Sequence, residues 1–176
     1  MEGIIKKNVV IIGDGYVGKT SILNSIKQQK FEEQIPNLYD DFEYTQTIGD
    51  KQFKVKFIDT AGQEEFAMIR AFSYKDADLF LLCFAVDDRV SFENMETKWI
   101  SDLKDYSDVP IILLGTKSDL RRTNRNCINK DEIVKFQKKI NALFYAECSA
   151  KTLSGIDDLK KRILKFFSKE RSCTIQ

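Results

Sequence analysis

Apolar residues follow two patterns along the chain. Short runs rich in Val, Ile, Leu and Phe predict strands, whereas apolar positions at three- and four-residue steps predict amphipathic helices. The runs predict strands at 9–12, 42–48, 51–58, 79–86, 111–115 and 142–146. The stepped pattern predicts helices at 19–29, 91–106, 130–140 and 155–167, with a shorter, irregular helix near 64–73. Strands and helices therefore alternate over most of the chain.

Gly49-Asp50 lies between two of the strand runs and predicts a tight hairpin turn, so those two strands should pair antiparallel. The other strands are joined through helices, which favours parallel pairing. We therefore expect an α/β fold with a six-stranded, mostly parallel sheet, one antiparallel strand and helices on both faces. No repeat or linker divides the chain, which indicates one domain over 1–168 and a short tail over 169–176.

The helix expected at 91–106 has a clear apolar stripe. Its core-facing positions are Phe92, Met95, Trp99 and Leu103. Trp99 is therefore interpreted as a core residue. Ser91 is the expected N-cap, because a hydroxyl there can accept a hydrogen bond from an unpaired amide of the first turn.

Composition excludes several classes of protein. The 176 residues are 43% hydrophobic and 31% charged, which is typical of a globular domain with a substantial core, and the net charge of +1 gives no field that would select nucleic acid. Histidine is absent, which excludes His-based catalytic triads and His zinc sites. The four cysteines are scattered without metal-ligand spacing, as expected in a reducing compartment. The sequence has no apolar run long enough to span a bilayer and no secretory signal pattern.

The segment after the first strand carries a phosphate-binding pattern. Gly13-Asp14-Gly15-Tyr16-Val17-Gly18-Lys19-Thr20 matches G-x-x-x-x-G-K-[ST] between a strand and a helix. Glycines let backbone amides form a concave anion nest, and the following helix adds the positive end of its dipole. Lys19 supplies a positive charge for the outer phosphates, and the Thr20 hydroxyl suits Mg²⁺. The pattern predicts a nucleotide polyphosphate on Mg²⁺ and the P-loop NTPase fold.

Three further motifs follow other strands, at the sheet edge where such folds bind ligands. Asp59-Thr60-Ala61-Gly62-Gln63 offers a carboxylate for Mg²⁺, the Gly62 amide for a γ-phosphate and the Gln63 side chain to orient water. Thr116-Lys117-Ser118-Asp119 ends in a carboxylate that can accept from both the N1–H and the amino group of guanine. Adenine presents no such pair of donors, so Asp119 should select guanine. The backbone of Cys148-Ser149-Ala150-Lys151 can bond the guanine O6.

With these motifs in this order, the chain resembles a Ras-superfamily small GTPase, and most closely the Rho/Rac family. The resemblance covers nearly the whole chain and includes the phosphate loop, Ile35-Pro36, the Thr116 motif, Glu147-Cys148-Ser149-Ala150, and Ser91-Phe92-Glu93-Asn94 leading to Lys98-Trp99. It implies a monomeric switch between GTP- and GDP-bound states with slow hydrolysis of GTP. It also implies an exchange factor, a GTPase-activating protein, a guanine-nucleotide dissociation inhibitor, and effectors that signal to the actin cytoskeleton.

The resemblance assigns roles to particular residues. Gln63, Lys19 and Gly62 would be catalytic, and Thr20, Asn37 and Asp59 would hold Mg²⁺. The ring of Phe31 would pack across the guanine, and Arg70 would contact partners. The whole nucleotide site would comprise Gly13, Asp14, Gly15, Tyr16, Val17, Gly18, Lys19, Thr20, Ser21, Phe31, Asp59, Ala61, Gly62, Thr116, Lys117, Asp119, Leu120, Ser149, Ala150 and Lys151.

A few positions depart from the family pattern. Asn37 stands where the family has a threonine that ligates Mg²⁺ in the GTP state, and Gln34 stands where it usually has a tyrosine. An Asn carbonyl can ligate, but it reaches further and carries an NH₂ that cannot bind a cation, so we expect weaker closure of this first switch. Tyr16 replaces a small residue and would lie over the nucleotide, contact a switch or face solvent. The segment 121–146 is too short for the extra helix typical of Rho proteins.

The chain ends in Cys173-Thr174-Ile175-Gln176, a C-a-a-X pattern that predicts prenylation of Cys173, with the final Gln favouring farnesyl. One lipid chain binds membranes only marginally, so a second signal is needed. Candidates for attraction to an acidic inner leaflet are Lys160, Lys161, Arg162, Lys165, Lys169 and Arg171. The expected location is the cytoplasm and the cytoplasmic face of the plasma membrane. The alternative for the helical lysines is an ordinary solvated face.

Two other functions stay open from the sequence. Asn37 and Gln34 would also suit a guanine-nucleotide-binding scaffold with little switching. A P-loop ATPase or small-molecule kinase is disfavoured by Asp119 and by the lack of an insertion that could bind an acceptor.

Overall fold

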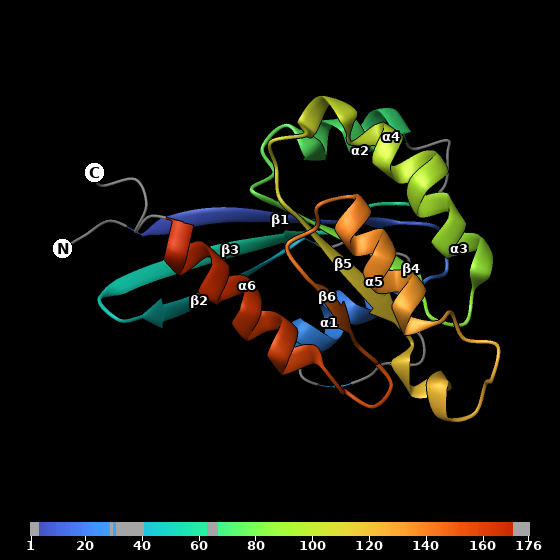
Figure 1. The fold of residues 1–176 in the computed structure, drawn as a ribbon. Coiled ribbons are helices and arrows are strands. Elements are labelled where there is room, and N and C mark those ends of the chain that lie inside the picture. Colours follow the sequence, from blue (N-terminus) through green and yellow to red (C-terminus); the bar gives the residue numbers. More distant parts are fainter. Residues whose placement is uncertain (1–3, 29, 31–40, 63–66, 171–176) are drawn as a thin grey trace.

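The structure, a computed structural model, describes residues 4–28, 30, 41–62 and 67–170 (Figure 1). These residues form one six-stranded sheet in the order β2-β3-β1-β4-β5-β6. The strands are β1 (Ile5–Gly13), β2 (Phe42–Ile48), β3 (Lys51–Ile58), β4 (Leu79–Ala85), β5 (Ile111–Thr116) and β6 (Tyr145–Glu147). The pair β2–β3 is antiparallel and the other neighbouring pairs are parallel, which confirms the predicted sheet. At the β2–β3 hairpin Gly49 has a φ of 63°, a backbone angle that favours glycine.

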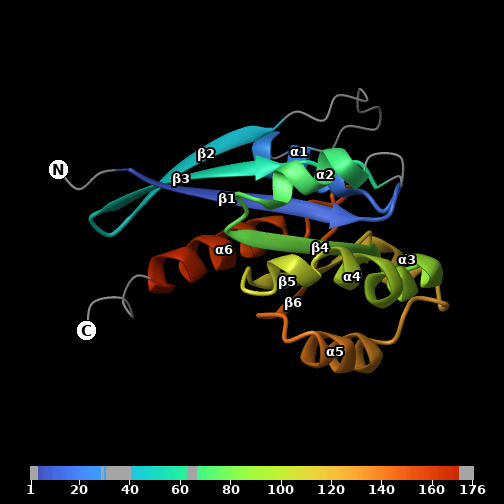
Figure 2. The ribbon, with the colours of Figure 1, turned by 90° about the horizontal axis from the view of Figure 1, so that it is seen from above.

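Helices cover both faces of the sheet (Figures 1 and 2). They are α1 (Lys19–Gln28), α2 (Ala67–Tyr74), α3 (Arg89–Asn94), α4 (Ile100–Asp102), α5 (Lys130–Lys139) and α6 (Ile156–Glu170). Because strand side chains alternate, Val9 and Ile11 of β1 pack in one core with α1 and α6, whereas Val10 and Ile12 pack in a second core with α2, α3 and α5. The sheet thus places the strand ends that carry the motifs between two rigid layers.

The helix predicted over 91–106 is interrupted. It starts as α3, widens into a π-helical turn at Met95–Trp99, and continues through α4 and a short 3₁₀ turn at Lys104–Tyr106. The prediction of Ser91 as N-cap is wrong, because Asp88 caps the helix by accepting from the Ser91 amide at 3.2 Å. Ser91 is buried inside the first turn, where its hydroxyl donates to the Asp88 carbonyl at 2.8 Å.

The region between β5 and β6 contains one 3₁₀ turn, Ser118–Arg122, and the helix α5. This agrees with the expected lack of the extra Rho-type helix. The strand predicted at 142–146 begins later, at Tyr145. The residues before it form the end of α5: Asn141 adopts a left-handed φ of 53°, and the Ala142 amide donates back to the Gln137 carbonyl at 3.0 Å.

Candidate functional site

The phosphate loop connects β1 to α1 and depends on glycine. Gly13 has a φ of 141° and Gly18 a φ of 95°. A Cβ on Gly13 would lie 2.2 Å from the Cys83 carbonyl oxygen, so no other residue fits there. Tyr16 has a φ of 62°, which is unusual for a bulky residue, and is 93% exposed at the rim of the cavity described below. Tyr16 thus stands at the opening of the cavity, and whether its ring lies over the nucleotide, contacts a switch or faces solvent stays a prediction.

Lys19 is buried inside this loop. Its Nζ donates to the Gly13 carbonyl at 2.8 Å and to the Asp14 carbonyl at 2.7 Å, and its residue exposure is 6%. Burial lowers the pKa of Lys19, while nearby acidic groups, including Asp59, oppose the shift. The loop therefore holds a desolvated cation against two carbonyl oxygens, in a position where a phosphate would be a stronger partner.

Thr20 and Asp59 bring two hard oxygen ligands together beside Lys19. The Thr20 hydroxyl donates to Asp59 Oδ2 at 2.5 Å, and the Thr60 amide donates to Asp59 Oδ1 at 3.0 Å. Burial raises the pKa of Asp59, and the Thr20 hydrogen bond and the Lys19 charge oppose this. A hydroxyl and a carboxylate fit Mg²⁺, which proteins usually hold through one or two carboxylates plus substrate phosphates. Asn37, the third predicted ligand, lies outside the described residues.

A cavity of about 320 Å³ opens beside the phosphate loop. It is lined by Tyr16, Gly18, Ser21, Ile22, Thr116, Lys117, Asp119, Leu120, Ala150 and Lys151. The loop and the two guanine motifs, far apart in sequence, thus share one hollow. Ile22 is the lining residue that sequence reasoning missed, because it carries no motif and lies one turn into α1. Phe31 and Gln63, both predicted in the site, lie outside the described residues.

Side chains and backbone fix the two guanine motifs to each other. Asp119 Oδ1 accepts from the Ser149 hydroxyl at 2.6 Å, and the Ser118 amide donates to the Cys148 carbonyl at 3.2 Å. The Thr116 hydroxyl donates to the Val17 carbonyl of the phosphate loop. The carboxylate predicted to read the base is therefore held in place from its own loop and from the next one.

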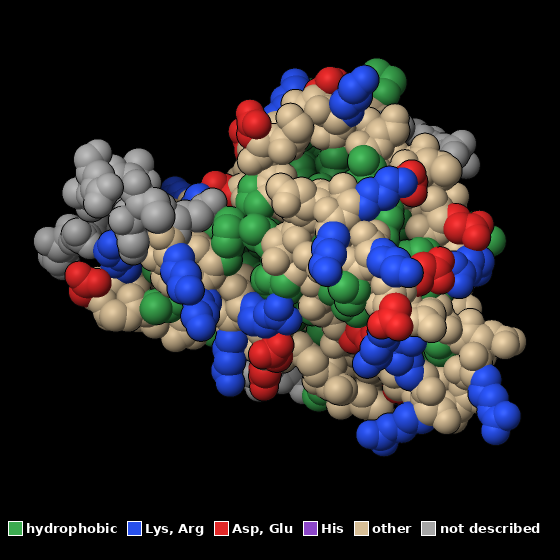
Figure 3. All heavy atoms as spheres, viewed as in Figure 1, with side chains coloured by type: hydrophobic (Ala, Val, Ile, Leu, Met, Phe, Trp, Pro, Cys, Tyr) green, Lys and Arg blue, Asp and Glu red, His purple; other side chains and the backbone are tan. Residues whose placement is uncertain are grey.

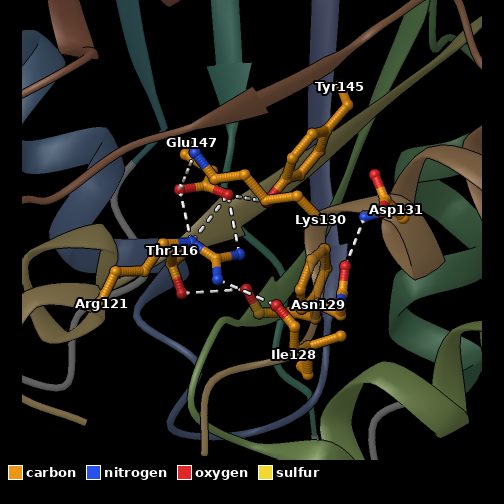
Figure 4. Close-up of polar contacts among 9 residues, drawn as sticks. Thr116, Arg121, Ile128, Asn129, Lys130, Asp131, Tyr145 and Glu147 are labelled. Carbon is orange, nitrogen blue, oxygen red and sulfur yellow. Dashed lines mark hydrogen bonds and ion pairs between the residues drawn. The ribbon is translucent and has the colours of Figure 1, made fainter. Parts of the chain in front are cut away.

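A second polar cluster, which sequence reasoning missed, links the same two loops (Figure 4), and its members Arg121, Tyr145 and Glu147 are not among the residues that line the cavity. Arg121 Nε lies 2.9 and 2.8 Å from the two carboxylate oxygens of Glu147, and Arg121 Nη1 donates to the Ile128 carbonyl at 2.9 Å. The Tyr145 hydroxyl donates to Glu147 Oε1 at 2.5 Å. Arg121 stands two residues after Asp119 and Glu147 two residues before Ser149, but nothing in the sequence pairs the two residues.

We expect Glu147→Gln to lower the free energy of unfolding by about 1–3 kcal/mol at neutral pH, because Arg121 loses its charged partner. Burial alone would raise the pKa of Glu147, but hydrogen bonds from Arg121 and Tyr145 and the Arg121 charge lower it overall. A lowered carboxylate pKa contributes stability above the unfolded-state pKa and loses it as pH falls through the folded-state pKa. Urea unfolding should therefore show the difference shrinking below about pH 4.3.

Glu132→Gln is the matched control for this prediction. It breaks the exposed bidentate pair with Arg89, whose side chains are 44% and 48% exposed, and should change stability little. A stability difference for Glu147→Gln that stays constant from pH 7 down to about pH 3 would contradict the assigned role of the Glu147 charge.

The segment that follows β3 is in direct contact with the phosphate loop. A Cβ on Gly62 would lie 2.3 Å from the Gly15 nitrogen and 2.4 Å from the Asp14 carbonyl carbon, so the two backbones touch. Arg70 of α2 donates to the Ala61 carbonyl at 2.9 Å and is 2% exposed. The expectation that Arg70 contacts partners is therefore wrong in this structure, because its guanidinium is buried against its own chain.

Together the sheet, the phosphate loop and the acidic base-reading loop define a P-loop protein with a guanine-nucleotide site. The family model "Ras family" matches residues 8–169. The chain is 34% identical over 169 residues to the "Ras-like GTP-binding protein RhoL" of Drosophila melanogaster, covering 94% of this chain and 89% of that protein. It is 37% identical over 180 residues to the "Rho-related protein racC" of Entamoeba histolytica, covering 93% of each.

The chain therefore belongs to the Ras family. It is a Rho-like small GTPase that binds GTP and GDP, hydrolyses GTP and interacts with regulators and effectors.

Proposed function

We propose that this GTPase is a Mg²⁺-dependent molecular switch that cycles between GTP- and GDP-bound states. One observation carries the proposal: Gly62 lies directly against the Gly15 nitrogen, with no room for a side chain between them. A γ-phosphate that binds to the Gly15 amide must contact Gly62 or displace it. The presence of the third phosphate is thereby linked to the chain that leads into α2, which is how a nucleotide state becomes a change of surface.

Amide hydrogen exchange tests the switch. Protein loaded with GDP and with a non-hydrolysable GTP analogue should differ in protection at Ala61, Gly62 and α2, and should not differ at α5, which serves as the internal control. Equal protection of both forms at every amide would contradict the proposed switch and favour the alternative, a guanine-nucleotide-binding scaffold. Nucleotide exchange followed with and without EDTA tests the Mg²⁺ dependence separately.

We infer that the first switch closes weakly in this protein, because Asn37 replaces a hydroxyl ligand with a longer amide. Asn37→Thr should increase the factor by which Mg²⁺ slows release of a fluorescent GTP analogue. Asn126→Thr, an exposed loop change, is the control and should leave that factor unchanged. An unchanged factor in Asn37→Thr as well would rule out Asn37 as the weak point.

The proposed switch also requires regulatory proteins, above all a GTPase-activating protein. Intrinsic hydrolysis in such proteins is on the order of 10⁻⁴ s⁻¹, and an arginine supplied by a GTPase-activating protein adds about 10⁵-fold. Arg70 is buried and bound to the Ala61 carbonyl, which favours an arginine supplied by a partner. An exchange factor, a dissociation inhibitor and actin-directed effectors rest on the family resemblance. Single-turnover hydrolysis with and without a Rho-type activating protein tests this; no stimulation counts against it.

We also propose attachment to the cytoplasmic face of the plasma membrane through a prenyl group on Cys173. No helix in the described part of the chain is long and apolar enough to cross a membrane. The described helix α6 ends at Glu170, three residues before Cys173, so a lipid there would bring the end of α6 to the bilayer surface within about 10 Å. Lys and Arg side chains lie over α6 on the face seen in Figure 3.

A groove of about 450 Å³ between β2 and α6 is the place where acidic headgroups would add a second signal. Its basic lining residues are Lys160, Lys161 and Lys165. Lys160 is engaged, because its Nζ lies 4.8 Å from the Tyr44 ring centroid and 3.9 Å from Asp157. Lys161 and Lys165 are exposed, so they carry the attraction.

Binding of the prenylated protein to phosphatidylcholine vesicles with and without phosphatidylserine tests the groove. The variant Lys161→Gln/Lys165→Gln should lose the gain from phosphatidylserine, whereas Lys135→Gln/Lys138→Gln on α5 should keep it. Equal binding of both variants would remove the groove from the proposal, and equal binding of Cys173→Ser and the parent protein would remove the prenyl anchor.

A further inference from the structure

The carboxylate of Asp14, inside the phosphate loop, is held by two donors from the α3 region. Trp99 Nε1 donates to Asp14 Oδ1 at 2.7 Å, and Asn94 Nδ2 donates to Asp14 Oδ2 at 2.6 Å. Trp99 is fully buried, as expected for a core residue, yet the one polar atom of its side chain is hydrogen-bonded to the phosphate loop. Core packing alone would not require this bond, because a phenylalanine would fill most of the same space.

The π-helical turn is what lets both donors reach one carboxylate. Asn94 and Trp99 are five positions apart, and in a regular α-helix such positions point about 140° away from each other. Here the Ile100 amide donates to the Met95 carbonyl, the wider i→i+5 pattern of a π-helix. The wider turn reduces the angle between the two side chains. Such single π turns occur often at functional sites, and this one faces the phosphate loop.

The same indole is also contacted by α2. The Arg70 guanidinium lies 4.9 Å from the Trp99 ring centroid, and Arg70 Nη1 donates to the Ala61 carbonyl at 2.9 Å. Arg70 Nη2 lies 3.6 Å from Asp102, on the helix that continues beyond the π turn. Gly62, next to Ala61, touches the backbone at Gly15. Contacts thus run in a closed ring from the phosphate loop through Trp99 and Arg70 to Ala61-Gly62, and back to the loop.

We infer that Trp99 and Asn94 are positioning residues that act through Asp14 and couple the phosphate loop to α2. The inference rests on the proposed switch and names the residues that connect the phosphate loop to α2 within it. When a third phosphate moves Gly62, the ring requires the Ala61 carbonyl, Arg70 and the indole to adjust together with the loop. The interaction should therefore matter more for the triphosphate form than for the diphosphate form.

Trp99→Phe keeps an aromatic ring next to Arg70 and removes the indole N–H. Asp14→Asn removes the negative charge from the group that accepts the hydrogen bond of this N–H. We expect each change to speed dissociation of a GTP analogue about tenfold, because each removes or weakens a buried hydrogen bond to a carboxylate. Dissociation of GDP from Trp99→Phe should change by less than about threefold. The effects in the double variant should be less than additive, because both changes act on the same bond.

Asn94→Ala provides a third variant that leaves the tryptophan in place, and it should shift the ratio of the two rates in the same direction. Asn8→Ala is its matched control, since Asn8 Nδ2 donates to the Asp76 carbonyl at 2.9 Å, away from the phosphate loop. Equal acceleration for GDP and the GTP analogue, or additive effects in the double variant, would overturn the inference. Failure of the switch itself appears separately, as equal hydrogen exchange in the two loaded forms of the parent protein.

Discussion

Asp119→Asn should reverse the base selectivity of the site, lowering the affinity for GDP and raising it for xanthosine diphosphate. The carboxylate can accept two charge-assisted hydrogen bonds from guanine, each contributing about 1.5–3 kcal/mol. An asparagine accepts one of them and turns its NH₂ toward the other donor. The loss should therefore be about 10²–10⁴-fold. Xanthine has a carbonyl where guanine has its amino group, so the new amide pairs with it at both positions.

Competition of both diphosphates against a fluorescent guanine nucleotide measures the reversal. The Ser149 hydroxyl, 2.6 Å from Asp119 Oδ1, can donate equally to an amide oxygen, so the loop should keep its geometry. Asp131→Asn in the first turn of α5 is the control and should leave the selectivity unchanged. Loss of GDP binding without any gain for the xanthine nucleotide would mean that Asp119 supports the loop and does not read the base.

The sequence predicts this region well because its information is local. Phosphate and base motifs need particular residue types at fixed spacing, and each follows a buried strand whose apolar run is easy to recognise. The parallel sheet puts the ends of β1 and β5 at the same edge, on either side of β4, so Gly18 and Asp119 line one cavity without any long-range signal having to be read. The hairpin at Gly49 is predicted for the same local reason, since a left-handed turn there favours glycine.

Pairs that form across the fold could not be predicted in this way. Trp99 and Asp14 are 85 positions apart, and Arg121 and Glu147 are 26 positions apart, so neither bond leaves a pattern in one sequence. Burial of Trp99 follows from its place in the apolar stripe, but the direction of its N–H depends on the π turn. Choosing Ser91 as N-cap failed because the helix begins earlier: Asp88, three positions before Ser91, has the extended backbone of an N-cap and accepts from the Ser91 amide.

Lys19→Met should lower the affinity for GDP by about 30- to 5,000-fold, since truncating one partner of a buried charge pair costs about 2–5 kcal/mol. The side chain also gives the site a pH signature. Burial lowers the pKa of Lys19 in the nucleotide-free protein, and a bound phosphate would raise it again. Binding above the lowered pKa therefore takes up a proton, so the affinity of the parent protein should fall as pH rises between the two values.

Titration calorimetry from neutral to alkaline pH, in buffers of different ionisation enthalpy, measures both the affinity and the proton uptake. The methionine variant should bind weakly with an affinity that changes less with pH, because it has no ammonium to protonate. Lys160→Met is the matched control: this lysine is also largely buried, with a side-chain exposure of 12%, but it lies over Tyr44 in the β2–α6 groove. It should leave both GDP affinity and its pH dependence unchanged. Parallel pH profiles for the parent protein and Lys19→Met would show that another group takes up the proton, and the desolvated Lys19 would then be a structural cation that does not titrate with the ligand.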